Sequence, residues 1–161
     1  MALKDVIGEI VTRLDNLRIR TERLEARKPH IPVCLLTDAT WTHNSSGNWL
    51  DVEFDTETLD PDGLHSTTSD KDHVTIKVPG VYVIVGAGTW AASGVGTERR
   101  LAISLNGTNF NIQSTAIACE SIAVAAICKL AIGDIVRLAG WQDSGGSLVL
   151  TLSNFAAVLI G

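Results

Sequence analysis

Apolar residues near the start of the chain recur with the spacing of a coiled coil. Successive members of the series, six apolar residues and one threonine, lie alternately four and three residues apart: Leu3, Ile7, Ile10, Leu14, Leu17, Thr21 and Leu24. This period forms one narrow stripe on a helix, which is the seam where helices of a coiled coil meet. The alternative is an amphipathic helix that packs on its own domain. Pro29 cannot continue the helix.

The residues beside this seam favour more than two helices. Val6 and Val11 widen the stripe, and the seam lacks the alternation of β-branched residues and leucine that favours dimers. Segment 20–25 resembles a motif of trimeric coiled coils, although Thr21 replaces the usual aliphatic residue. We therefore predict a trimeric coiled-coil stalk over residues 1–28. Its interface is predicted to contain Leu3, Ile7, Ile10, Leu14, Leu17 and Leu24.

Beyond the helix, apolar and polar residues alternate with the period of β-strands. In segment 49–55, for example, Leu50, Val52 and Phe54 face a core, and acidic residues lie between them. Pro79-Gly80 is predicted to be the turn of a central hairpin formed by residues 73–91. About eight strands separated by turns predict an all-β sandwich or jelly roll. The predicted strands are 31–36, 49–55, 73–78, 81–91, 99–105, 115–130, 135–141 and 148–160.

Three segments are apolar on both faces, around 81–85, 115–128 and 155–160. A two-sheet sandwich buries only one face of each sheet, so a second apolar face indicates an interface between copies of the chain. On strand 81–85 we assign the three valines to the core and the intervening residues to this interface. The second face, and with it the interface of a homotrimer, is predicted to include Tyr82, Ile84, Val124, Phe155 and Leu159.

Composition and charge exclude several functions. The 161 residues are 45% hydrophobic, enough for one domain with a sizeable core. Residues 1–28 have a net charge of +2 and the remainder has −7, which argues against nucleic-acid binding by the head. Apolar runs are too short to cross a bilayer, and the charged N-terminal segment does not resemble a signal peptide. We expect synthesis in a cytoplasm without membrane insertion.

Two motifs suggest enzymes or cofactor sites. Strand 81–85 leads into Gly86, Gly88 and Ala91 with dinucleotide-site spacing, but that site needs a helix, which segment 93–96 does not favour. Asp143-Ser144-Gly145-Gly146 resembles the nucleophile turn of trypsin-like proteases, but a catalytic serine also needs an oriented histidine. We interpret this segment as a hairpin turn. No catalytic or cofactor-binding residue is predicted.

Acidic residues, histidines and cysteines raise the question of a metal site. The acidic residues of segment 55–72 lack the spacing of a calcium-binding loop, so we interpret them as solvated. His65 and His73 could bind a metal on a trimer axis, but we interpret them as histidines without a metal. The three cysteines lack metal-site spacing and are interpreted as buried thiols: Cys34, Cys119 and Cys128. No metal site is predicted.

Several segments resemble, in order, the strands and turns of C1q/TNF-like trimeric jelly-roll domains. The Pro79-Gly80-Val81-Tyr82 turn and the Gly133-Asp134 turn are the most specific. The resemblance extends from about residue 31 to the end. It implies a two-sheet jelly-roll head over residues 29–161, in a compact homotrimer with the chain ends along a threefold axis. The matching segments are 54–57, 65–66, 74–82, 103–108, 130–136 and 142–148.

Versions of this domain with a short coiled coil and no secretion signal resemble head fibres, capsid decoration proteins and fibre knobs of tailed bacteriophages. The resemblance implies a non-enzymatic virion protein that binds itself and a capsid or tail protein. The alternative is a receptor-binding knob that recognises a host-surface glycan or protein through exposed loops 37–48, 56–72, 92–98 and 106–114. The candidate sugar-stacking residues are Trp41, Trp49, Trp90 and Trp141.

Overall fold

The structure is a computed structural model that describes residues 3–25, 30–37, 40–44, 46–116 and 121–161. It divides into two compact units, Met1–His30 and Ile31–Gly161, which we call the helical unit and the head and describe separately.

The helical unit contains the predicted helix, α1 (Leu3–Glu25). The described side chains of α1 are exposed, among them the seam residues Ile7, Ile10, Leu14 and Leu17. Leu3 and Leu24 belong to the helix, but their side chains, like the predicted helix end at residues 26–29, lie outside the described part of the chain. Most of the stability of an amphipathic helix comes from packing of its apolar face, so an exposed apolar seam favours contact with a partner.

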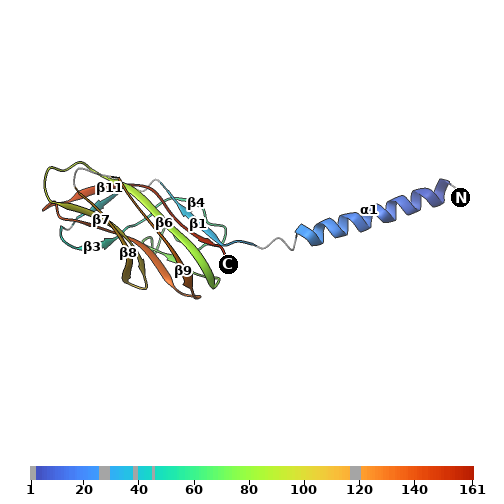
Figure 1. Cartoon of the computed structure of the whole chain (residues 1–161). Coiled ribbons are helices and arrows are strands. Elements are labelled where there is room, and N and C mark those ends of the chain that lie inside the picture. The colour runs from blue at the N-terminus through green and yellow to red at the C-terminus, as the bar shows by residue number, and fades with distance from the viewer. Residues whose placement is uncertain (1–2, 26–29, 38–39, 45, 117–120) are drawn as a thin grey trace. The chain divides into compact units, whose positions relative to one another are not determined.

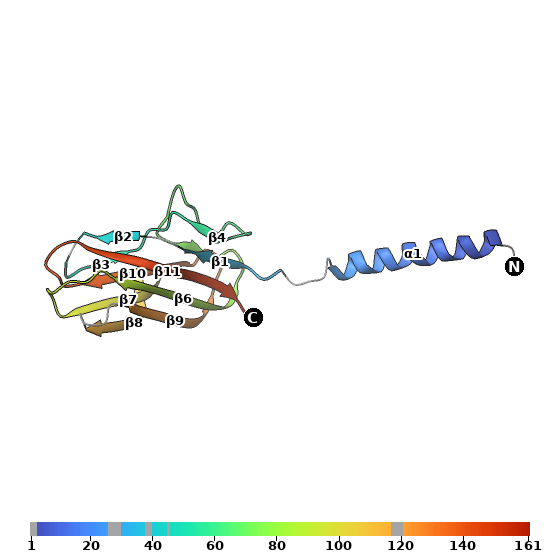
Figure 2. The same cartoon turned by 90° about the horizontal axis from the view of Figure 1, so that it is seen from above.

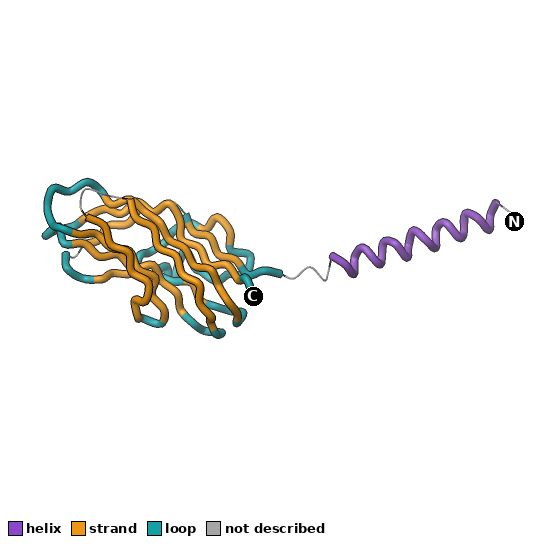
Figure 3. The backbone as a smooth tube through the Cα atoms, viewed as in Figure 1, coloured by secondary structure: helices purple, strands orange, loops and turns teal. Residues whose placement is uncertain are grey.

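The described part of the head contains eleven strands in two antiparallel sheets. Figures 1 and 3 show how these strands are arranged. Sheet I has the order β4-β1-β11-β6-β9, and β2 pairs with β11. Sheet II has the order β3-β10-β7-β8, and β5 pairs with β10. The strands of sheet I are β1 (Val33–Leu36), β2 (Thr40–His43), β4 (Glu57–Leu59), β6 (Gly80–Trp90), β9 (Ser121–Leu130) and β11 (Leu148–Leu159). Those of sheet II are β3 (Trp49–Asp51), β5 (Val74–Thr75), β7 (Glu98–Leu105), β8 (Thr108–Ala116) and β10 (Ile135–Gln142).

The core lies between the two sheets and is mainly aliphatic. Alternate residues of long strands such as β6 and β9 point into it, as the period of two predicts. The rings of Phe54 and Phe155 stack within it, with centroids 5.4 Å apart. The predicted core positions Val52, Leu101 and Ile103 are confirmed, since each is fully buried.

The predicted central hairpin is wrong. β5 pairs with β10 in sheet II, whereas β6 pairs with β11 and β9 in sheet I. Pro79-Gly80 therefore carries the chain from one sheet to the other. The hairpin is excluded because β11 and β9 already occupy both hydrogen-bonding edges of β6. The turn at 143–146 likewise joins β10 of sheet II to β11 of sheet I, so it is a turn but not a hairpin.

Three segments predicted as exposed loops contain strands. β2 lies within 37–48, β4 within 56–72, and most of 106–114 belongs to β8. β8 escaped prediction because polar residues interrupt its pattern. Its Asn111 donates from Nδ2 to the backbone oxygen of Ala125 on β9, 2.8 Å away, and Figure 2 shows the two strands side by side. Residues 117–120, predicted as part of a strand, lie outside the described residues.

We predict that Gly86→Ala destabilises the head, because glycine is required where the two sheets approach closely. A Cβ at this buried position of β6 would lie 2.6 Å from Cδ1 of Leu138, itself fully buried. Overpacking of this kind lowers the free energy of unfolding by about 1–3 kcal/mol. Chemical denaturation would measure the loss. Gly94→Ala is the control, because a Cβ there meets nothing within 4 Å, and equal stability of the two variants would contradict the prediction.

Candidate functional site

The face of sheet I that points away from the core is apolar. Cross-strand pairing brings Val83 of β6 beside Ile127 of β9 and Val158 of β11, and Val85 beside Ala125 and Ala156. Ile127 is 70% exposed. Short side chains make most of this face, so it suits close contact with another flat surface. We call it the outward face, and it consists of Val33, Leu35, Val83, Val85, Ala87, Ala123, Ala125, Ile127, Ala156 and Val158.

Polar residues border the outward face. At one end the hydroxyl groups of Thr89 and Ser121 are hydrogen-bonded, 3.1 Å apart, across β6 and β9. A hollow of about 280 Å³ lies beside them, partly lined by Ala87 and Ala123. At the other end of β9, Lys129 is exposed. An apolar centre with a polar rim is the usual anatomy of a protein interface.

The structure reverses the assignment of faces made from the sequence. Tyr82, Ile84 and Phe155 are fully buried in the core of a single chain, and Val124 is 3% exposed. Leu159 is half-buried and packs against the same core. These side chains do not form the second apolar face. The alternate residues of the same strands form it, so the predicted interface moves to the opposite side of β6, β9 and β11.

A signal for the correct assignment was present in the sequence. Thr89, Ser121 and Lys129 share the parity of the outward residues on their strands. Polar residues at strand ends mark the face that has no core behind it, because an unpartnered polar group is costly to bury. On β6 the valines gave no such distinction, since Tyr82 and Ile84 are equally apolar.

A buried ion pair holds two exposed loops of the head together. Arg99 is 2% exposed and donates to a carboxylate oxygen of Asp143, 3.0 Å away, and to the backbone oxygen of Val95. Asp143 also accepts hydrogen bonds from the backbone nitrogens of Thr97 and Glu98. Partial burial alone would raise the pKa of Asp143, but these hydrogen bonds and the Arg99 charge lower it to about 2. The carboxylate thus joins the loop before β7 to the turn after β10.

The predicted protease-like motif belongs to this structural joint. The hydroxyl of Ser144 donates to the backbone oxygen of Gly146, and its amide donates to the side chain of Gln142. Neither contact is with a histidine. The dinucleotide-like glycines are also structural, since β6 runs through Gly86 and Gly88 to Trp90 without a following helix.

The acidic segment between β4 and β5 is used to order its own backbone. Asp60 accepts hydrogen bonds from the amides of Leu64 and His65, at 2.9 and 2.8 Å. Asp72 pairs with Arg137 and His73. Partial burial alone would raise the pKa of Asp72, but the hydrogen bonds from these two side chains lower it. Among the described residues no cluster of acids, histidines and cysteines could hold a metal ion.

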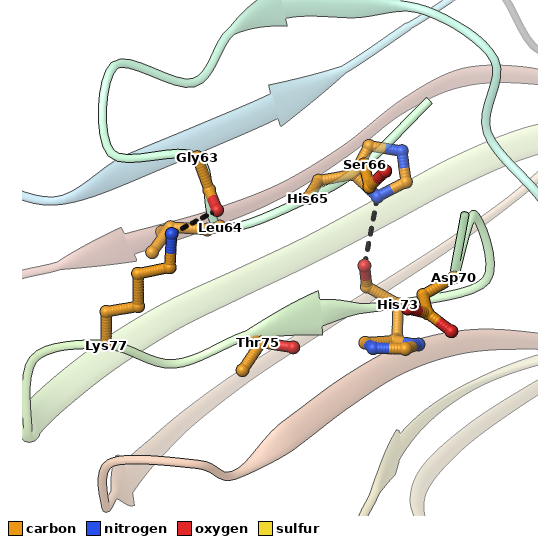
Figure 4. A pocket seen from close by; sticks show the side chains of 8 residues that line it. All are labelled: Gly63, Leu64, His65, Ser66, Asp70, His73, Thr75 and Lys77. Atoms are coloured by element: carbon orange, nitrogen blue, oxygen red, sulfur yellow. Dashed lines mark hydrogen bonds between the residues drawn. The ribbon is translucent and has the colours of Figure 1, made fainter. Parts of the chain in front are cut away.

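A pocket of about 240 Å³ lies beside this segment (Figure 4). His65, Ser66, Asp70, His73 and Lys77 are among its lining residues. Lys77 donates from Nζ to the backbone oxygens of residues 62 and 63, which leaves its charge directed at the wall of the pocket. The ring of His65 is directed towards the backbone oxygen of His73.

The four tryptophans have different environments. Trp90 is 1% exposed, and Trp41 packs against the core. Trp49 and Trp141 are half-buried cross-strand neighbours on the surface of sheet II that faces away from sheet I. Arg100 lies over the Trp141 ring, 4.3 Å from its centroid, and is paired with Glu98. Trp49 and Trp141 are therefore the two tryptophans available for ligand stacking.

The predictions for thiols and membrane segments can be checked in part. Cys34 is buried and Cys128 half-buried, whereas Cys119 lies outside the described residues. No helix in the described part of the chain is long and apolar enough to span a membrane.

Comparison with solved structures establishes the fold. The globular domain of zebrafish complement 1qA protein superposes with a TM-score of 0.55 at 19% identity, covering 81% of this chain and 98% of that one. Murine APRIL superposes with a TM-score of 0.59 at 13% identity, covering 81% of this chain and 100% of that one. The head has a C1q/TNF-like jelly-roll fold. No protein-family model and no curated protein sequence matches the chain.

The C1q/TNF-like fold confirms what the turn motifs predicted about the architecture of the head. The resemblance of Pro79-Gly80-Val81-Tyr82 to this family was informative even though the segment is not a hairpin. A fold of this kind serves many partners, so it does not identify a ligand. Function must be argued from the outward face, the exposed loops and the helix.

We predict that Asp143→Asn destabilises the head at neutral pH and much less in acid. Because the folded-state pKa is about 2, below the ordinary 3.8, the carboxylate stabilises the fold above the ordinary value. This contribution disappears as the pH falls towards about 2. Denaturation midpoints of wild type and variant across this range should converge. Asp70→Asn, in a different exposed loop, is the control, and a constant difference for Asp143→Asn would contradict the prediction.

Proposed function

We propose that this protein is a non-enzymatic, homotrimeric structural protein of a tailed-bacteriophage particle, displayed on the capsid or tail. The observation that carries the self-association is the outward face of sheet I. Sheet II covers one side of β6, and its other side presents Val83 and Val85 to the surface. A contiguous apolar face of this kind marks an interaction site on a folded domain.

A second, independent feature supports three copies. The seam of α1 repeats every 3.5 residues over three heptads, and its composition favours more than two helices. Packing of the apolar face supplies most of a helix's stability, so assembly of the helix and assembly of the head would reinforce one another. Within a ring of three, the outward face of each copy would contact a different surface of the next copy, because a closed ring of three uses heterologous contacts.

The placement on a phage particle rests on the motif order together with the coiled coil. The structural comparisons support only the fold. In the proposed arrangement α1 assembles and anchors the trimer, and the loops of the head face the surroundings. The test is location: antibodies against the head should label intact particles at the capsid or at the tail. Purified particles without the protein would refute the proposal, even if the isolated chain is trimeric.

Receptor binding is the second candidate, and the Trp49–Trp141–Arg100 row favours it. These side chains lie on the surface opposite the outward face, so they would remain accessible in a trimer. Tryptophan and arginine are enriched at binding hot spots. Purified head should then adsorb to host cells and block infection, and Trp141→Ala should weaken both effects. If the head did not adsorb to host cells, receptor binding would be excluded and a structural role as a decoration protein would be favoured.

We predict that Ile127→Asp dissociates the trimer without unfolding the head. An aspartate on this apolar face would be an unpaired carboxylate buried against another copy, which costs several kcal/mol. Light scattering should give three chains for the wild type and one for the variant.

Ile132→Asp is the matched control. Ile132 is 68% exposed, close to the 70% of Ile127, but it lies in the turn between β9 and β10 and not on the outward face. This variant should stay trimeric. If both variants remained trimeric, or the wild type were a monomer, the outward face would not be the interface.

A further inference from the structure

Asn106 and Gly107 form the tight turn between β7 and β8. Leu105 pairs with Thr108 across the turn, and the two residues between them both have positive φ angles, 50° for Asn106 and 83° for Gly107. A hairpin loop with this pair of angles is a type I′ turn, in which ψ of the first residue is about +30°. In the amino-acid sequence, Asn106 is the only asparagine that a glycine follows.

An asparagine followed by glycine can lose its side-chain amide without an enzyme. The backbone nitrogen of Gly107 gives up its proton and attacks Cγ of Asn106, so that a new C–N bond forms. The bond between Cγ and Nδ2 breaks, and the amide nitrogen leaves as ammonia, taking the proton through water. Water then opens the resulting five-membered succinimide ring to aspartate or isoaspartate. Glycine favours the attack because it has no Cβ to obstruct the nitrogen.

The conformation of the turn opposes this ring closure. The ring can close only when Cβ of Asn106 and the nitrogen of Gly107 lie on the same side of the Cα–C bond of Asn106. In an L-residue with ψ of about +30°, these two atoms lie on nearly opposite sides of that bond. The backbone of Asn106 must therefore leave the turn conformation before its side chain can react.

Hydrogen bonds to the start of β10 hold Asn106 in the turn. Its backbone nitrogen donates to the oxygen of Ile135, and its Oδ1 accepts a hydrogen bond from the nitrogen of Ile135, both at 2.9 Å. Its Nδ2 donates to Oδ1 of Asp134, 3.0 Å away. A hydrogen bond to a charged acceptor is roughly twice as strong as one between neutral groups. Rotation of Asn106 out of the turn must break these contacts.

The Asp134 carboxylate is itself held in place by the turn between β9 and β10. Its Oδ2 accepts a hydrogen bond from the nitrogen of Ala131 at 2.8 Å. The backbone oxygen of Asp134 accepts another from the nitrogen of Ile76 at 2.9 Å. The acceptor that meets the Asn106 side chain is therefore preorganised, so its hydrogen bond costs little further ordering.

We propose that Asn106 is a site of spontaneous deamidation that the fold keeps unreacted, and that Asp134 is the positioning residue that holds its turn closed. Deamidation then proceeds only while the turn is open. The product has an oxygen in place of Nδ2, so the donor to Asp134 is lost and two carboxylates meet. Isoaspartate also adds a methylene group to the main chain of the loop, which disturbs the pairing of Leu105 with Thr108. The modification thus releases the β7–β8 turn from β10.

Peptide mass spectrometry of the full-length protein, incubated in mildly alkaline buffer, would measure the rate of deamidation at Asn106. The same chain unfolded in urea provides the unprotected rate. Because opening the turn breaks several hydrogen bonds, the rate in the folded protein should be lower by about tenfold or more. Equal rates in the folded and the unfolded chain would overturn the proposal.

Two variants assign the protection to Asp134. Asp134→Ala removes the acceptor of the Nδ2 hydrogen bond and should raise the rate at Asn106 in the folded protein about tenfold. Gly86→Ala, which is expected to destabilise the head from a position on β6, is the matched control and should leave this rate unchanged. An unchanged rate in Asp134→Ala, or an equal rise in Gly86→Ala, would overturn the role of Asp134.

Nitrogen NMR of the wild-type side chain gives a readout that does not depend on a variant's folding. The Nδ2 proton of Asn106 that is directed at Asp134 should exchange with water about tenfold more slowly than the amide protons of free asparagine. Exchange as fast as that of free asparagine would show that the hydrogen bond does not hold the side chain, and would overturn the proposal.

Discussion

The organising constraint of this head is that β6, an interior strand of sheet I, is apolar on both sides. β6 lies between β11 and β9 in sheet I, with Tyr82 and Ile84 in the core and the valines on the outward face. One side is satisfied within the chain by sheet II. The other has no cover in the described part of one chain, so the stability of a single head and its proposed self-association depend on the same strand. The predicted coiled-coil seam of α1 is likewise an apolar surface without cover in the described part of one chain.

The period of the sequence predicted the class of fold but not which face of each strand is inside. The four-and-three spacing of apolar residues identified α1. Alternation identified the strands β7, β10 and β11 and core residues such as Phe54 and Leu101. On β6, where both faces are apolar along most of the strand, the interface was assigned to the core side. The polar residues near the strand ends, Thr89 on β6 and Ser121 and Lys129 on β9, have the parity of the outward face and would have distinguished the two faces.

Local sequence patterns could not predict which strands pair with one another, for a similar reason. A proline–glycine turn between two apolar segments is typical of a hairpin, yet β5 and β6 enter different sheets. Which partner a strand takes depends on the free edges that remain elsewhere in the fold. The edge strand β8 was missed because polar residues interrupt its pattern and its apolar residues Phe110 and Ile112 are exposed, so no buried alternation marks it. The contacts of the His65 ring with the backbone oxygens of Phe54 and His73 also depend on segments that meet only in the folded chain.

The joint formed by Arg99 and Asp143 has a consequence for recognition. The loop before β7 and the turn after β10 lie more than forty residues apart in sequence, yet several hydrogen bonds to one carboxylate tie them together. A ligand that touches both segments would meet a preorganised surface and would lose little conformational entropy in ordering it. The amino-acid sequence of the loop tips can therefore vary while the Arg99–Asp143 joint beneath them keeps the two segments together.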